Sequence, residues 1–154
     1  MKRSKLNKGA TLIEILVALL VLSFGILGMA ALQIRAVKGN HSAMQRTQAV
    51  MMSYYILDAM RVDRRRIKAD PSLYNITDAD SAAAFNNATL DHHNLKHWIE
   101  SLKTSIGSAG DSTTKGSISC TKTGEIVNCN VKVKWDDSRA NGLGDQTVET
   151  NASL

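Results

Sequence analysis

The longest apolar stretch of the chain lies close to its N-terminus. From Ile15 to Ile34 there are 20 consecutive residues without a charge, most of them leucine, isoleucine, valine or alanine. A helix of this length rises by about 30 Å, which is the thickness of the hydrocarbon core of a bilayer. The pattern therefore predicts a helix that is able to span a membrane.

Helical periodicity continues beyond the apolar stretch. Apolar residues recur there at steps of three and four, which is typical of an amphipathic helix. The predicted core stripe comprises Val50, Tyr54, Leu57 and Met60, broadened by Ala43, Met44, Thr47 and Met51, with Arg46, Gln48, Asp58 and Arg61 opposite. We expect one long helix over about residues 11–66, whose second half packs on a small head, and Pro71 ends it.

A second helix is predicted at about residues 90–105. Its apolar stripe is Leu95, Trp98, Ile99, Leu102 and Ile106. Asp91 is the expected N-cap residue. Between the two helices, residues 71–88 are small and polar, and they predict a loop with a short helical turn around Ala82 to Phe85.

The C-terminal part has the alternation of β-strands. Val127, Cys129, Val131, Val133 and Trp135 fall on one face of a strand. Gly124-Glu125 suits a type II′ hairpin turn, which pairs residue 123 with 126 and residue 120 with 129. Gln146 to Thr150 adds a last strand, so that the sheet covers about residues 117–150 in three or four strands.

The two cysteines fall opposite each other in this hairpin. Cys120 and Cys129 form a non-hydrogen-bonded pair, whose Cα atoms lie about 4.5–5.5 Å apart, within disulfide range. We predict a disulfide between them, with two reduced thiols as the alternative.

The positive charge of the chain is concentrated at its tip. The net charge is +5, and Lys2, Arg3, Lys5 and Lys8 precede the apolar stretch without any acid. Setting these four aside leaves 15 basic and 14 acidic residues, so the head lacks the basic face of a nucleic-acid-binding domain. The run Arg64 to Arg66 is flanked by aspartates and is expected to be a solvated helix end. The cations at the tip place the N-terminus in the cytoplasm.

Three interpretations of the apolar segment compete. A secretory signal peptide would be cleaved after Gly28-Met29-Ala30. A plain membrane anchor fits the length but leaves Glu14 unexplained. Cleavage after Gly9 would make Glu14 the fifth residue of the mature chain, and this interpretation uses every feature.

The stretch from Lys8 to Glu14, KGATLIE, resembles the class III signal of type IV pilins and type II secretion pseudopilins. The resemblance implies a prepilin peptidase that cuts between Gly9 and Ala10 and N-methylates Ala10. It also implies that Glu14 pairs with the α-amino group of Ala10 on a neighbouring subunit. The longer stretch LIEILVALLVLSFGILGMAALQ is similar to PilV-type minor pilins.

This resemblance implies an α+β, type IV pilin-like fold, in which a long N-terminal helix packs on a small antiparallel sheet. Residues 1–9 are then a leader peptide, residues 10–34 a transmembrane and assembly helix, and residues 35–154 a periplasmic head. Glu14 is the expected assembly residue, Gly9 and Ala10 the processing residues, and Cys120 and Cys129 the disulfide. An oxidising periplasm suits that bridge.

The function implied is that of a minor pilin that joins the type IV pilus and the complex that initiates its assembly. The expected partners are other minor pilins, the major pilin, the prepilin peptidase and the inner-membrane assembly platform. The protein would be a single-pass inner-membrane protein before it enters the fibre at the cell surface. A minor pseudopilin of a type II secretion system is the alternative, followed by a DNA-uptake pilin that binds through Arg64 to Arg66, Lys132 and Lys134.

Enzymatic and metal-binding functions lack a signature. The chain has no HExxH motif, no P-loop and no glycine-rich dinucleotide turn. His93 and His97 are four residues apart, as metal ligands can be, but no third ligand stands at a suitable spacing. We therefore expect exposed structural histidines, no metal, no cofactor and no enzyme.

Overall fold

The computed structural model describes residues 11–107, 110–138 and 144–154. The chain forms two compact units, Met1–Lys38 and Gly39–Leu154. The elements in chain order are α1 (Leu12–Val62), α2 (Arg64–Ala69), the 3₁₀ turn η1 (Pro71–Tyr74), β1 (Ile76–Ala79), the 3₁₀ turn η2 (Ala82–Ala84), α3 (Leu90–Ser105), β2 (Lys115–Thr123), β3 (Ile126–Asp136) and β4 (Asp145–Ser153). A long N-terminal apolar helix and a small antiparallel sheet are thus both present, and the α+β, type IV pilin-like architecture is confirmed.

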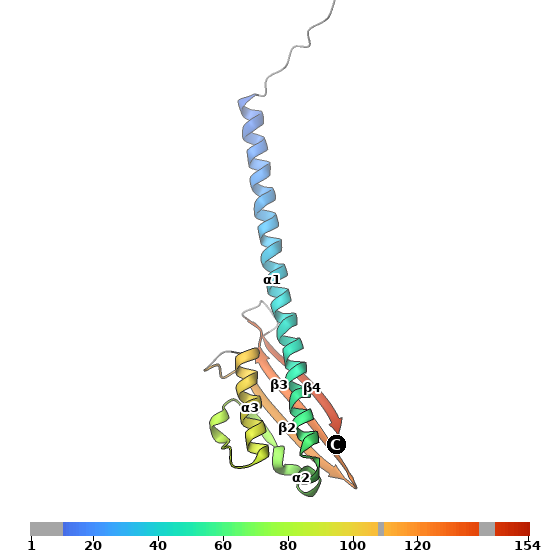
Figure 1. The fold of residues 1–154 in the computed structure, drawn as a ribbon. Helices are drawn as coiled ribbons and strands as arrows, with labels where there is room; N and C mark the ends of the chain where they lie inside the picture. Colours follow the sequence, from blue (N-terminus) through green and yellow to red (C-terminus); the bar gives the residue numbers. More distant parts are fainter. Residues whose placement is uncertain (1–10, 108–109, 139–143) are drawn as a thin grey trace, which may run out of the picture. The chain divides into compact units, whose positions relative to one another are not determined.

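The second unit contains a four-stranded antiparallel sheet in the order β1-β2-β3-β4 (Figure 1). Along β3 the residues alternate between buried and more exposed positions. The helix α3 and the part of α1 within this unit lie on the buried face (Figure 1). The core between them is made by Ala49, Ile56, Leu57, Met60, Ile67, Tyr74, Leu95, Trp98, Ile99, Leu102, Ile118, Val127, Val131, Val133 and Trp135.

The predicted hairpin is confirmed in its register. Thr123 pairs with Ile126, and Cys120 pairs with Cys129. Gly124 has a φ of 62°, which glycine adopts without a steric cost and which a type II′ turn requires at this position. The two cysteines form a disulfide with a Cα–Cα distance of 4.1 Å, slightly below the predicted range.

The first long helix ends earlier than predicted. α1 stops at Val62, and α2 begins at Arg64. Asp63 between them leaves helical geometry, with φ −93° and ψ 16°. Its side chain is buried and accepts hydrogen bonds from Arg66 and Tyr74, so tertiary contacts interrupt a pattern that is helical in sequence.

The segment 71–88 is not only a loop. It contains β1, which pairs with β2. The strand has only four residues and no clear alternation, and side chains hold it in place. Asn75 Oδ1 accepts from the backbone N–H of Cys120 at 2.7 Å, and Ser117 Oγ accepts from that of Asp78 at 2.9 Å. The short turn predicted near Ala82 is present as η2.

The second predicted helix is confirmed, but its N-cap is not Asp91. The N-cap residue is Thr89, and Asp91 lies in the first turn. Asp91 is buried because its carboxylate is engaged by Arg66.

Candidate functional site

The helix α1 begins with a reciprocal contact between Thr11 and Glu14. Oε2 of Glu14 accepts from the backbone N–H of Thr11 at 3.4 Å, while the N–H of Glu14 donates to the carbonyl of Thr11 at 3.1 Å. Thr-x-x-Glu is the spacing of a capping box, and an acid in the first turn is favoured by the helix dipole. Glu14 therefore has a local role in starting the helix, which our sequence analysis missed although the signature was visible.

The processing residues Gly9 and Ala10 lie outside the described residues, as does the leader. Cleavage between them remains a prediction from the sequence.

The apolar part of α1 leaves its side chains exposed. Among the described residues, α1 is the one helix long and apolar enough to cross a membrane, with a mean hydropathy of 2.7 over its most apolar 18-residue window. Large side chains from Leu12 to Val37 are at least half exposed. Its Ser23 hydroxyl is satisfied within the helix, since it donates to the carbonyl of Leu19 at 2.7 Å. Such a surface requires lipid or protein around it.

Within the second unit, α1 buries a different face from the one predicted. Leu57 and Met60 are buried as predicted, and Val50 is partly buried. Tyr54, Met44 and Met51 are about half exposed, and Ala43 and Thr47 are exposed too. The face toward the sheet is instead made by Gln45, Ala49, Ser53 and Ile56 together with Leu57 and Met60.

The buried face is polar in part, and its side-chain donors have partners, whereas Oε1 of Gln45 has none within the described part of the chain. Ser53 donates to the carbonyl of Ala49 at 2.9 Å, and Nε2 of Gln45 donates to the carbonyl of Ile106 at 3.0 Å. Because both faces of the helix carry apolar residues, periodicity alone could not choose between them.

An exposed face of α1 carries Met44, Met51, Tyr55 and Val62, which we call the Met/Tyr face, and Tyr55 also contacts His97 of α3. Their spacings of seven, four and seven keep these side chains within a narrow stripe of a helix with 3.6 residues per turn. Met51 is 59% exposed and Val62 is 83% exposed. A stripe with this spacing suits packing against another helix.

The arginine run is only partly a solvated helix end, because the exposed Arg66 pairs with two buried aspartates. Arg66 binds Asp63 at 3.0 Å and Asp91 at 2.8 Å, and both aspartates are buried. The hydrogen bond to Asp91 raises the pKa of Arg66 above its usual value. Burial is the largest influence and would raise the pKa of Asp91, but the hydrogen bonds from Arg66, Thr89 and the backbone together outweigh it, and the pKa is lowered. Arg66 therefore joins α2 to α3.

Tyr74 closes the same network. Its hydroxyl donates to Asp63 at 3.3 Å and accepts from Asn94 at 2.9 Å. Burial raises the pKa of Tyr74 to about 12, so this hydroxyl stays neutral and remains a donor at neutral pH. The network is structural, and no sequence motif indicated it.

The two lysines of the DNA-binding alternative are also engaged. Lys132 pairs with Glu149 at 2.7 Å, and Lys134 pairs with Asp78 at 2.9 Å. The hydrogen bond from Lys132 is the main cause of the lowered pKa of Glu149, and the hydrogen bond from Lys134 is the main cause of the lowered pKa of Asp78. Three of the five cations considered for DNA binding are thus neutralised by carboxylates, which weakens that alternative.

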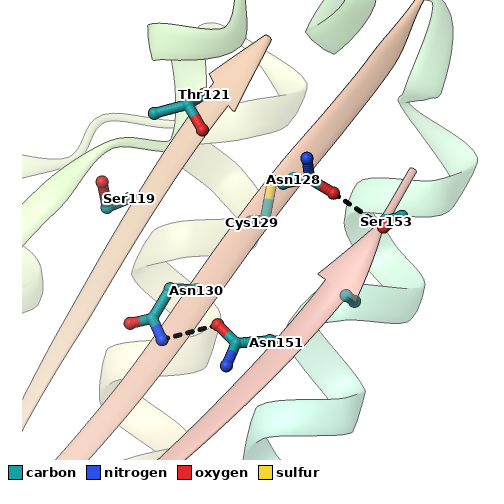
Figure 2. Close-up of a pocket in the computed structure, with 8 residues that line it drawn as sticks. Ser119, Thr121, Asn128, Cys129, Asn130, Asn151 and Ser153 are labelled. Carbon is teal, nitrogen blue, oxygen red and sulfur yellow. Dashed lines mark hydrogen bonds between the residues drawn. The ribbon is translucent and has the colours of Figure 1, made fainter. Parts of the chain in front are cut away.

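A shallow polar groove lies on the outer face of the sheet (Figure 2). Its side chains are uncharged amides and hydroxyls that bind one another. Asn130 donates to Asn151 at 2.8 Å, and Ser153 donates to Asn128 at 2.7 Å, as the dashed lines in Figure 2 show. These contacts make the groove an ordinary solvated face of an antiparallel sheet.

The comparisons with known proteins bear on the N-terminal segment. The prokaryotic N-terminal methylation motif matches residues 4–30, which include Gly9, Ala10 and Glu14. The comparisons with curated proteins and with solved structures found no match. The matched segment and the single long apolar helix fit an inner-membrane single-pass anchor. Together with the α+β architecture, the motif supports a type IV pilin-like protein.

Proposed function

We propose that this protein is a minor pilin of the PilV type, which enters the type IV pilus and takes part in the complex that initiates its assembly. The observation that carries the proposal is the methylation motif at residues 4–30, followed by an exposed apolar helix. The prepilin peptidase would remove residues 1–9 on the cytoplasmic side and methylate Ala10. The head would then lie in the periplasm, where other minor pilins, the major pilin and the inner-membrane assembly platform are its partners.

Glu14 has two roles in this proposal. In the single chain its carboxylate caps the start of α1 through the N–H of Thr11. In the assembly it pairs with the methylated amine of Ala10 on a neighbouring subunit. A carboxylate in the bilayer centre costs on the order of 3 kcal/mol, and such residues usually have a partner. The hydrogen bond to Thr11 is long, at 3.4 Å, so breaking it costs little free energy when the carboxylate binds a cation instead.

A minor pseudopilin of a type II secretion system is the second candidate, because the methylation motif is common to both systems. The similarity of the stretch FGILGMAALQ to minor pilins favours the pilus. Localisation of the tagged protein in sheared pili, against localisation with secretion components, distinguishes the two.

Mass spectrometry of the mature N-terminus tests the processing step. We expect the native protein to begin with N-methylated Ala10, and a start at Ala31 would instead indicate a secreted protein. Replacement of Gly9 by leucine should leave the longer precursor. If the Gly9→Leu protein is processed normally, the peptidase assignment is wrong.

A pair of substitutions at position 14 separates the two roles of Glu14. Glutamine keeps an oxygen that accepts from Thr11 but removes the charge, whereas alanine removes both. In the registration role, the charge of Glu14 sets the position of each subunit against its neighbour. If Glu14 has this role, Glu14→Gln and Glu14→Ala are both processed but both absent from sheared fibres. Normal incorporation of Glu14→Gln would show that the cap alone matters, and it would overturn the registration role.

A further inference from the structure

The three histidines of α3 differ in their surroundings. His93 and His97 are exposed and one helical turn apart, and on a regular helix such residues are neighbours with Cβ atoms about 5–6 Å apart. His92 faces elsewhere, because its Nδ1 lies 3.1 Å from Oδ1 of Asn86 and its ring packs edge-on against Phe85. His93 and His97 therefore form a pair on one face, and His92 is not part of it.

Tyr55 of α1 fixes the orientation of His97. Its hydroxyl lies 3.1 Å from Nδ1 of His97, and the two rings are 5.8 Å apart. Ser101 Oγ lies 3.4 Å from the same nitrogen. Among the described residues no hydrogen bond reaches Nε2 of His97. When Tyr55 accepts the proton of Nδ1, Nε2 keeps its lone pair, which is the arrangement of metal-ligating histidines whose second nitrogen is held by a neighbour.

The charges around the pair are mixed. Glu100 is exposed and stands three residues after His97, where it neighbours that side chain on the helix surface. Lys96 stands three residues after His93 and is partly buried. The carboxylate of Glu100 favours a nearby cation, and the lysine opposes it.

We propose that His93 and His97 bind a divalent transition cation that prefers imidazole, with Tyr55 as the positioning residue for His97. Nε2 of His97 and one ring nitrogen of His93 are the protein ligands. No group of three His, Cys, Asp or Glu side chains gathers in the described part of the chain, so water completes the coordination. Cu²⁺ binds more tightly than Zn²⁺, as the general order for nitrogen ligands requires. This site does not rest on the proposed pilin role, although Tyr55 also belongs to the Met/Tyr face of α1.

Titration calorimetry on the full chain in detergent tests the site, with CuCl₂ and ZnCl₂ as probes. We expect one equivalent of metal per chain and a rise in Tm that EDTA reverses, because a ligand that binds only the folded state stabilises it. His93→Gln and His97→Gln should each abolish the rise. His92→Gln is the matched control on the same helix, and it should bind as the unmodified protein does.

Tyr55→Phe tests the positioning role separately. The substitution keeps the ring and removes the hydroxyl, so affinity should fall about tenfold, as for other groups that orient a metal ligand. Unchanged affinity in Tyr55→Phe would overturn the role of Tyr55. Equal binding by the double variant His93→Gln/His97→Gln, or no binding by the unmodified protein, would overturn the site itself.

Discussion

At the residue scale, Gly116 of β2 and Trp98 of α3 make a close approach in the head core. A Cβ atom at position 116 would lie 2.6 Å from Cζ3 and 2.7 Å from Cη2 of Trp98. The Trp98 ring is fully buried, and its Nε1 donates to the carbonyl of Met52 at 2.9 Å. The ring is therefore held from two sides and is unable to retreat.

We predict that Gly116→Ala destabilises the protein by about 1–3 kcal/mol, the usual cost of overpacking a core. The direction of the change in stability is informative. Alanine in place of a strand glycine otherwise stabilises a protein by about 0.4–1 kcal/mol, because it reduces the conformational entropy of the unfolded chain. Urea unfolding followed by circular dichroism measures the change. Ser119→Ala, at an exposed position of the same strand, is the control. A Gly116→Ala protein as stable as the control would contradict the close contact.

The surroundings of Asp111 should make the stability of the folded protein depend on pH. Burial alone would raise the pKa of Asp111, but hydrogen bonds from Thr113 and Thr114 lower it from 3.8 to about 2. A carboxyl group whose pKa is lower in the folded state stabilises the protein above its unfolded pKa, and this contribution disappears as the pH falls toward 2.

Asp111→Asn should therefore lower the free energy of unfolding at pH 7 by no more than about 2 kcal/mol, and by less where solvent screens the carboxylate. The variant should also lose less stability than the unmodified protein between pH 4 and pH 2. Unfolding curves at several pH values measure both effects, with Asp80→Asn as an exposed control. Parallel pH profiles for Asp111→Asn and the unmodified protein would refute the assignment.

At the scale of elements, local chemistry determined what could be predicted. The register of the β2–β3 hairpin follows from Gly124, and the boundaries of α3 follow from the stripe around Trp98. The strand β1 could not be predicted, because side chains from distant positions hold it. The end of α1 at Val62 depends on two partners of the buried Asp63, Arg66 and Tyr74, which are three and eleven residues away.

The disulfide between β2 and β3 should contribute about 2–3 kcal/mol, the loop-closure entropy of a ring of about ten residues. The double variant Cys120→Ala/Cys129→Ala should keep the hairpin register, since the Gly124 turn remains, but unfold at lower denaturant. Dithiothreitol should destabilise the unmodified protein by a similar amount and leave the double variant unchanged. No difference between oxidised and reduced protein would show that the bridge does not constrain the unfolded chain.

The junction of α1, α2 and α3 depends on Arg66. Arg66→Met should lower Tm, because it leaves Asp63 and Asp91 buried without their cation. Arg65→Met, at the neighbouring exposed position, is the matched control and should have little effect. Equal Tm values for the two variants would mean that solvent or other donors satisfy the aspartates.

At the scale of the whole molecule, exposed apolar surface lies on α1 both in the first unit, from Leu12 to Val37, and in the second unit, on the Met/Tyr face. Lipid is able to cover the first surface before assembly. The second surface belongs to the unit that contains the folded sheet, and its exposure in the single chain is costly unless another protein covers it. If the protein enters a fibre as proposed, a helix of a neighbouring subunit would cover the Met/Tyr face.

We predict that Met51→Glu leaves the head folded but reduces incorporation into sheared fibres. The side chain is 59% exposed, so a charge costs little in the single chain. Once a partner helix covers position 51, the same charge would be buried without a cation, at a cost of several kcal/mol. Ala43→Glu adds the same charge at an exposed position outside the Met/Tyr face and is the control. Both variants should unfold like the unmodified protein, and only Met51→Glu should remain in the membrane fraction. If Met51→Glu enters fibres as efficiently as Ala43→Glu, no partner covers this face.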